Sequence, residues 1–220
     1  MQNKSVTFSK STIHVLEVNG FSENSIFVES NDTQETILID PGFYTAAERK
    51  QTAKFVEQNG LKVVAILLTH AHIDHILGLA WACETFQLPF HHSAADLPNL
   101  EAGPRVGAMY GFDYEAPNLN LRREIDGDLA WESLGCKVLQ VPGHALGHLA
   151  FDFGEGYVVA GDTLFRESIG RTDLPGGNHA ELLTSIRNVL FALPDSTIVF
   201  PGHGPQTTIG HEKQRNPFLR

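Results

Sequence analysis

Four side chains of the types that bind metal ions lie within six consecutive residues of this chain. His70, His72, Asp74 and His75 follow directly on an apolar run over residues 63–69. Imidazoles and a carboxylate at the end of a buried strand would lose their hydration without compensation, so packing explains such a cluster poorly. Nitrogen and oxygen donors on several sides of one small volume suit a borderline cation such as Zn²⁺. The stretch therefore predicts a metal site.

The same local pattern occurs three more times along the chain. His144 follows residues 136–143, Asp162 follows 157–161, and His203 follows 197–202, and each preceding run is apolar, rich in β-branched residues and ends in glycine. Such runs predict buried strands. A terminal glycine lets the backbone turn sharply and approach an ion closely. We therefore expect the strand ends to converge on one rim and to bring all seven donors together.

In their order along the chain, these donors resemble the pattern of the metallo-β-lactamase superfamily, which is H-x-H-x-D-H followed by a distal His, an Asp and a His. The resemblance implies a mixed α/β fold, an αββα sandwich with the site at one rim. It implies two divalent metal ions per chain, zinc first and iron or manganese as alternatives. The implied ligands are His70, His72 and His144 for one ion, Asp74, His75 and His203 for the other, and Asp162 bridging the two.

The rest of the sequence narrows the resemblance to single-domain hydrolases similar to glyoxalase II, the hydroxyacylglutathione hydrolases. The segments that carry this narrower resemblance are 161–165, 168–177, 200–205, 207–210 and 216–218. This implies cleavage of S-lactoylglutathione-like thioesters by a hydroxide between the two ions, with Asp74 and Asp162 as catalytic carboxylates. Two departures from the family are visible. The chain is expected to lack the C-terminal helical domain that helps two-domain enzymes hold glutathione, and it has Ala145 where a threonine is usual.

Four further residues are candidates for supporting roles. Arg171 and Arg166 follow Asp162 closely and could bind a substrate carboxylate, since a guanidinium can hold it with two hydrogen bonds, although each could equally form a surface ion pair. Asp40 looks like the superfamily aspartate that orients the histidine loop. His148, four residues after His144, is expected to contact a ligand without binding metal.

Two other functions remain open. The persulfide dioxygenases of the same superfamily also carry a Gly-Arg-Thr-Asp stretch, and there His70, His144 and Asp162 would hold a single Fe(II) as a 2-His-1-carboxylate triad. Segments 174–177 and 200–205 look more like the hydrolase branch. A metal-binding protein without catalytic activity is the third reading.

Composition limits the possible partners. A chain of 220 residues with 42% hydrophobic content is expected to form a single domain over residues 1–220. Its net charge of −10 disfavours nucleic acid, so we expect a small-molecule substrate, and the resemblance implies that this is a thioester. The N-terminal segment has no signal-peptide core and no run reaches membrane-spanning length, which predicts a cytoplasmic protein without a membrane partner. Cys83 and Cys136 are predicted to be buried, reduced thiols. The oligomeric state stays open.

Local patterns predict the main elements. Residues 24–30 and 36–40 form a hairpin, and a helix begins at Thr45 and ends at Asn59-Gly60. A strand over 62–68 leads into the histidine cluster, and one helix over 75–86 places its positive end near the site. The segment 93–118 mixes Pro, Gly and aromatic residues and is expected to be a lid over the site or a connecting loop. A helix over 179–193 follows the last glycine pair.

Overall fold

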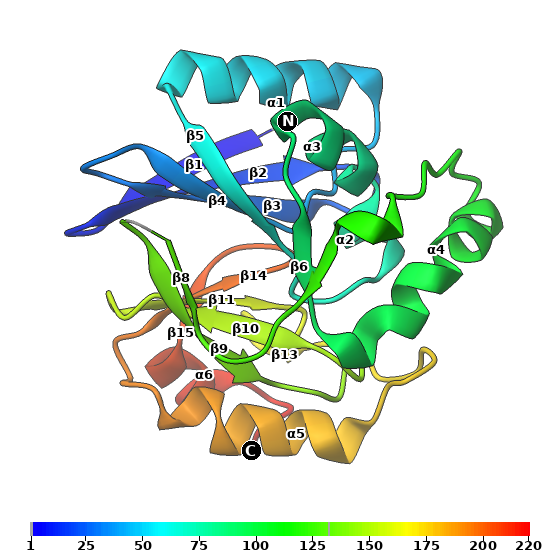
Figure 1. The fold of residues 1–220 in the computed structure, drawn as a ribbon. Helices are drawn as coiled ribbons and strands as arrows, with labels where there is room; N and C mark the ends of the chain where they lie inside the picture. Colours follow the sequence, from blue (N-terminus) through cyan, green and yellow to red (C-terminus); the bar gives the residue numbers. More distant parts are fainter. Residues whose placement is uncertain (1, 132) are drawn as a thin grey trace.

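The computed structural model describes residues 2–131 and 133–220. Two β-sheets lie face to face, and helices cover the outer face of each sheet (Figure 1). This arrangement confirms the αββα sandwich.

The N-terminal sheet has seven strands in chain order: β1 (Gln2–Thr7), β2 (Ser11–Val18), β3 (Glu23–Ser30), β4 (Glu35–Ile39), β5 (Lys62–Leu67), β6 (Phe90–His92) and β7 (Arg122–Glu124). The first four strands are antiparallel, so the expected hairpin of β3 and β4 is confirmed. From β4 onward neighbouring strands are parallel. The carboxyl end of β5 therefore delivers the histidine cluster to one rim of the sheet.

The C-terminal sheet has six strands, in the spatial order β15 (Thr207–Thr208), β14 (Ile198–Pro201), β11 (Tyr157–Gly161), β10 (Leu149–Asp152), β9 (Gly135–Gln140) and β8 (Leu129–Ala130). A separate two-stranded ribbon pairs β12 (Leu164–Phe165) with β13 (Ser168–Ile169). Asp162 comes directly after β11, and His203 follows β14, which pairs in parallel with β11. Both donors thus leave neighbouring strands on the same side.

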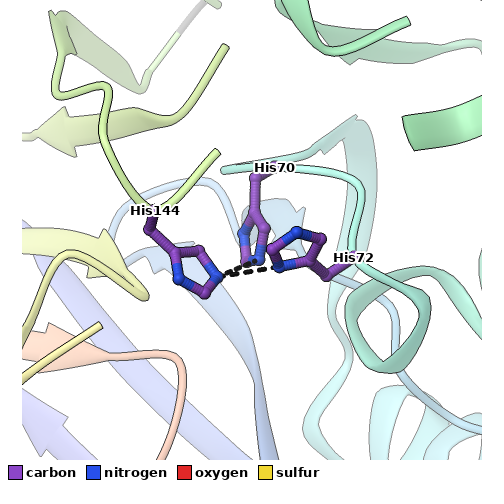
Figure 2. A group of neighbouring side chains, drawn as sticks. All are labelled: His70, His72 and His144. Carbon is purple, nitrogen blue, oxygen red and sulfur yellow. Dashed lines mark hydrogen bonds between the residues drawn. The ribbon is translucent and has the colours of Figure 1, made fainter. Parts of the chain in front are cut away.

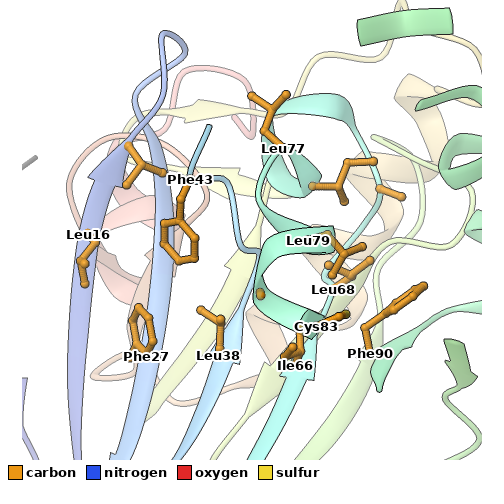
Figure 3. Close-up of a cluster of buried hydrophobic side chains, with 14 of the residues drawn as sticks. Leu16, Phe27, Leu38, Phe43, Ile66, Leu68, Leu77, Leu79, Cys83 and Phe90 are labelled. Carbon is orange, nitrogen blue, oxygen red and sulfur yellow. The ribbon is translucent and has the colours of Figure 1, made fainter. Parts of the chain in front are cut away.

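Three layers of apolar side chains hold the sandwich together. Ile37, Phe151 and Tyr157 belong to the layer between the two sheets and are fully buried. A second layer fills the space between the N-terminal sheet and its helices, where Phe27, Leu38 and Leu79 meet (Figure 3). The third lies under the helices of the C-terminal sheet. Removal of this apolar surface from water fixes the sheets, and through them the strand ends that carry the donors.

The helix predicted from Thr45 is confirmed as α1 (Ala46–Asn59). Thr45 and Glu48 form a capping box, and Gly60 ends the helix in the left-handed conformation at φ +66°. A side-chain cap of this kind stabilises a helix by about 1 kcal/mol.

The single helix predicted over 75–86 is wrong, because the chain forms two helices, α2 (Ile73–Ile76) and α3 (Leu79–Phe86). Gly78 separates them. Its N–H donates to the carbonyl of Pro41 at 2.8 Å, and a Cβ at this position would collide with the backbone of Phe43. A four-residue helix also provides little of the dipole that was expected to favour an anion.

Most of segment 93–118 is helical and not a loop. A short 3₁₀ turn, η1 (Ala94–Asp96), leads into α4 (Leu97–Tyr110), which lies beside α2 (Figure 1). Pro98 is tolerated in the first turn, where its missing N–H would have no partner within the helix. Gly103 and Gly107 allow the Tyr114 ring to pack closely on the helix. Movement of this segment as a lid stays a prediction.

The remaining elements are η2 (Leu119–Leu121), α5 (His179–Asn188), η3 (Leu190–Ala192) and α6 (Ile209–Arg215). The helix predicted over 179–193 therefore ends earlier and continues as a 3₁₀ turn. Cys83 and Cys136 are free and buried, as predicted, and burial raises the pKa of each thiol to about 12. In the part of the chain that the structure describes, each helix is too short or too polar to cross a bilayer.

Candidate metal centre

Two buried carboxylates hold the histidine loop that follows β5. Asp40 accepts hydrogen bonds from the Thr69 N–H at 2.7 Å and from the Thr69 hydroxyl at 2.6 Å. Asp96 accepts from the N–H of Ala71. Asp40 has a φ of +53°, a conformation that costs a residue with a side chain about 1 kcal/mol or more and often marks a functional position. The backbone on both sides of His70 is thereby fixed.

His70, His72 and His144 form the first group of ligand atoms (Figure 2). The Nε2 of His144 lies 2.8 Å from His72 Nδ1 and 3.2 Å from His70 Nε2. Nitrogens that share one tetrahedral zinc ion lie roughly 3.3 Å apart, given a Zn–N distance of about 2.0–2.1 Å. The three imidazoles thus stand at about the spacing that one ion requires.

Hydrogen bonds on the outer ring nitrogens determine which atoms face inward. His144 donates from Nδ1 to the carbonyl of Arg171 at 2.7 Å. The Thr69 hydroxyl donates to Asp40 and therefore accepts from His70 Nδ1, which lies 3.0 Å away. Both assignments follow from the hydrogen-bond network. In the rings of His70 and His144, Nε2 is therefore left with its lone pair, as metal binding requires.

Burial keeps the first group neutral. It lowers the pKa of His70 well below the usual range, lowers that of His72 to about 3, and lowers that of His144. Neighbouring imidazoles lower the pKa of His70 and His72 further, because a second positive charge nearby disfavours protonation. Neutral imidazoles at neutral pH are ready to bind a cation without first losing a proton.

Asp74, His75 and His203 form the second group. The Asp74 Oδ2 atom lies 3.1 Å from His203 Nε2 and 3.8 Å from His75 Nε2. His75 donates from Nδ1 to Asp40 at 3.0 Å, and His203 donates from Nδ1 to the carbonyl of Phe21 at 3.1 Å. In both rings Nε2 again faces the centre.

Asp162 lies between the two groups. Its Oδ1 atom is 3.4 Å from His75 Nε2, and its Oδ2 atom is 3.5 Å from His144 Nε2 and 3.6 Å from His203 Nε2. Burial opposes ionisation of this carboxyl, but His75, His203 and His144 together bring its pKa below the usual range. The pKa of Asp74 is lowered in the same way, chiefly by His75 against the effect of burial. One carboxylate therefore reaches both groups in its charged form.

Unsatisfied buried atoms test whether a cation fits this centre. His75 Nε2 and Asp162 Oδ1 are buried and have no hydrogen-bond partner among the described residues. Leaving such an atom unpaired costs about 1–3 kcal/mol, and more when it is charged. A Cβ on Gly202 would collide with Asp162 Oδ1 and the His75 ring, so only glycine permits this approach. The donors fit a pair of divalent cations.

A third group, Asp40, His70 and His75, also has ligand atoms close together. Asp40 is already occupied, since its two oxygens accept from Thr69 and His75. Asp40 therefore contacts both the histidine loop and His75, and its orienting role stays a prediction.

The other predicted residues occupy different positions. His148 accepts a hydrogen bond at Nε2 from the N–H of Asp162 at 3.0 Å and stacks on His70 with ring centres 4.7 Å apart, so it supports ligands from behind. The Arg171 side chain is exposed and makes two hydrogen bonds of 2.7 Å to Asp173, which is the surface ion pair that the sequence had left open. Arg166 is also exposed.

Sequence reasoning missed three polar residues at the centre. Glu23 is fully buried, accepts from Ser25, and has Oε1 3.8 Å from His75 Nδ1; burial raises the pKa of its carboxyl well above the usual value. Asn19 donates to the carbonyl of Asp74 at 2.9 Å. Neither has a local signal. Asp96 does have one, because an acidic residue just before Leu97-Pro98 is typical of a helix start.

Comparison with known proteins identifies the family. A family model described as the metallo-beta-lactamase superfamily matches residues 18–203, which include every candidate ligand. The chain belongs to this superfamily. Probable metallo-hydrolase YqgX of Bacillus subtilis is 35% identical, over 93% of this chain and 95% of the relative. Hydroxyacylglutathione hydrolase GloC of Haemophilus influenzae is 34% identical, over 94% of this chain and 97% of the relative.

Solved structures with a similar fold agree with this assignment. TTHA1623 in a di-iron-bound form has a TM-score of 0.84 and 38% identity, covering 93% of this chain and 99% of its own. The B3 metallo-β-lactamase BLEG-1 has a TM-score of 0.79 and 32% identity, covering 94% of this chain and 99% of its own. ETHE1 from Myxococcus xanthus has a TM-score of 0.71 and 25% identity, covering 99% of this chain and 84% of its own. The protein is a metallo-hydrolase of this superfamily, and its His/Asp groups together with the di-iron relative support the use of two metal ions.

Proposed function

We propose that the protein hydrolyses thioesters of the S-lactoylglutathione type. The observation that carries this proposal is the position of Asp162 between two groups of ligand atoms, each suited to one divalent cation. The relative GloC supports the substrate class. Since 97% of GloC is covered by the match, little of it lies outside the region shared with this chain. A separate glutathione-binding domain is therefore not part of the proposal.

The metal-binding roles are those that the sequence predicts. His70, His72 and His144 would hold one ion, Asp74, His75 and His203 the other, and Asp162 both. Bound divalent ions of this kind lower the pKa of a water molecule to about 7 and polarise a carbonyl group. We propose zinc as the native ion because imidazole donors predominate, with iron and manganese as alternatives. The di-iron-bound form of TTHA1623 supports iron as one of these alternatives.

The side chains of this chain would then position the reactants. Asp74 can accept a hydrogen bond from the attacking water, since its carboxylate is ionised and lies at the edge of the second group. Asp162 would fix the distance between the two groups. A thiolate leaving group with a pKa of about 8.5 departs without a general acid, whereas an amide nitrogen requires one. This difference favours a thioester over a lactam or peptide.

Residues beside the two ligand groups are candidates for substrate contact. The Phe21 carbonyl binds His203, and the Phe21 ring packs edge-on against Tyr110 of α4 with ring centres 5.4 Å apart. The Arg171 carbonyl binds His144 on the other side. We propose that the exposed ring of Tyr110 contacts the organic part of the substrate and that Arg171 binds a carboxylate after releasing Asp173. Recognition of a small molecule needs no nucleic acid or membrane partner.

One alternative rests on a specific geometry. His144 Nε2 lies 3.2 Å from His70 Nε2 and 3.5 Å from Asp162 Oδ2, so these three residues could bind one Fe(II) with open positions, as in a persulfide dioxygenase. The likeness to BLEG-1 adds β-lactam hydrolysis as an outcome to be tested.

The deciding experiment combines metal analysis with three assays. Protein loaded separately with zinc, iron and manganese is assayed for hydrolysis of S-lactoylglutathione, oxygen uptake on glutathione persulfide, and cleavage of a chromogenic cephalosporin. We expect two ions per chain and thioester hydrolysis. One iron per chain with oxygen uptake would replace the proposal by the dioxygenase. Inertness toward several thioesters together with efficient lactam cleavage would replace it by a lactamase.

A further inference from the structure

Residues 21–24, around the start of β3 in the N-terminal sheet, form hydrogen bonds with the loop that carries His203. The N–H of Asn24, at the start of β3, donates to the carbonyl of Gly202 at 2.7 Å, and Glu23 pairs with His203 as an isolated antiparallel bridge. On the other side of the same turn, His203 donates from Nδ1 to the Phe21 carbonyl. Residues 21–24 thus bind both the backbone of this loop and the His203 ring, although the two segments belong to different sheets.

The Asn24 side chain completes this contact. Its Nδ2 atom donates to the carbonyl of Pro201 at 3.0 Å and to the carbonyl of Gly204 at 2.9 Å. These carbonyls lie on either side of His203 in the chain. Both N–H bonds of the amide are used, and the side chain is buried. A single amide therefore sets the width of the turn that presents His203.

His203 depends on such support more than His75 and His144 do, because neighbouring side chains surround its ring less completely. Its side chain is 25% exposed, whereas those of His75 and His144 are 0% and 2% exposed. Strand β14 ends at Pro201, and Gly204 has a φ of +73°, so the ring stands on a turn beyond the sheet. Because part of the His203 ring is exposed to solvent, packing alone cannot fix its orientation. The hydrogen bonds to residues 21–24 supply the missing constraint.

We propose that Asn24 is a positioning residue that raises the affinity for the second metal ion only, because it holds His203 opposite Asp74 and Asp162. The inference rests on the two-ion part of the proposed function and is independent of the substrate. Loss of the amide would let the turn relax, so that the Nε2 atom of His203 leaves its place 3.1 Å from Asp74 Oδ2. The first group contains no residue that Asn24 contacts, so its affinity should persist.

The variant Asn24→Ala removes both side-chain donors, and Asn24→Asp keeps the shape while placing a carboxylate against two carbonyl oxygens. Asn31→Ala is a matched control directly after the other end of β3, where the asparagine side chain accepts from Thr12 and donates to the Phe8 carbonyl. Asn31 lies on the exposed surface, and its hydrogen bonds go to Lys10, Thr12 and Phe8, none of which is a candidate ligand.

The test is competitive zinc titration against a chelator, with metal content measured after desalting. For Asn24→Ala and Asn24→Asp we expect the second ion to bind about 10–100-fold more weakly, the usual effect of losing a residue that supports a ligand, with the first ion changed less than about threefold. Asn31→Ala should bind both ions as the wild type does.

Thermal unfolding in the presence of chelator separates positioning from general stability. Equal loss of both ions, or unchanged affinity for the second ion in either folded variant, would overturn the inference. If Asn24→Ala fails to fold, Asn24→Asp decides the matter alone. A wild-type protein that binds only one ion would instead refute the two-ion assignment in the proposed function.

Discussion

His75 donates a hydrogen bond from Nδ1 to Asp40 Oδ2 at 3.0 Å, and this contact links the two halves of the metal centre. The same carboxylate accepts from the N–H and hydroxyl of Thr69, which in turn orients His70. One aspartate therefore sets a ring in each ligand group. The arrangement explains why a residue with a side chain occupies the left-handed region at position 40.

Replacing Asp40 by alanine should weaken both metal ions. His75 would lose the acceptor that fixes its tautomer, and the Thr69 hydroxyl would lose the acceptor that orients it toward His70. Loss of such support typically lowers metal affinity about 10–100-fold. The measurement is zinc affinity by chelator competition. Asp32→Ala, at an exposed turn, is the control and should have wild-type affinity. Loss of the second ion alone would show that Asp40 acts only through His75.

A methyl group at position 202 should disturb the centre directly. The Cβ of Gly202→Ala would press on Asp162 Oδ1 and the His75 ring, and overpacking of this kind costs roughly 1–3 kcal/mol. We expect metal content to fall while the circular dichroism spectrum keeps its shape. Gly20→Ala serves as the control, because a Cβ there meets nothing within 4 Å. Full metal content in Gly202→Ala would contradict the close approach.

The candidate ligands could be proposed from the sequence because each group of donors follows directly on an apolar run. An apolar run ending in glycine is visible locally, and donors such as Asp162 and His203 come directly after such runs. The first capped helix was visible for the same reason, since Thr45, Glu48 and Gly60 lie on the helix they terminate. Signals that reside within one element can be read without knowing its neighbours.

The remaining features depend on contacts between distant segments. Gly78 lies between two helices, where its N–H donates to the Pro41 carbonyl and Phe43 leaves no room for a side chain, and nothing near position 78 reveals these contacts. Glu23 and Asn24 stand in an ordinary polar stretch and acquire importance only where the two sheets meet. Helix α4 was missed although Pro98 and Gly111 mark its ends, because Pro104 and two glycines inside it suggested a loop.

Stability should depend on pH through Asp96. Burial raises the pKa of this carboxyl to about 6, against the effect of its hydrogen bonds with Ala71 and Asn99. Because the unfolded value is about 3.9, the folded protein binds the proton more tightly. The contribution to stability is therefore fully present below pH about 4 and is lost as pH rises through 6, by roughly 3 kcal/mol in all.

Asp96→Asn removes this titration. With both proteins in chelator, the free energy of unfolding of the wild type minus that of the variant should fall by most of that amount between pH 4 and pH 7. Urea unfolding across this range measures it, with Asp32→Asn as an exposed control whose difference from the wild type should stay flat. A constant difference for Asp96→Asn would mean that the buried carboxyl does not titrate in this window.

Kinetics should separate the metal centre from substrate contact. Asp162→Ala removes the carboxylate that reaches both ligand groups, so metal content and kcat for thioester hydrolysis should collapse together. Arg171→Ala leaves the ligands intact, because His144 binds the carbonyl at position 171 and not the guanidinium. We expect it to raise KM several-fold with kcat nearly unchanged, about 1 kcal/mol of lost binding. Asp173→Ala breaks the ion pair from the other side, freeing the guanidinium, and should lower KM. If KM for glutathione thioesters is the same in both of these variants, Arg171 is a surface residue and substrate carboxylates are bound elsewhere.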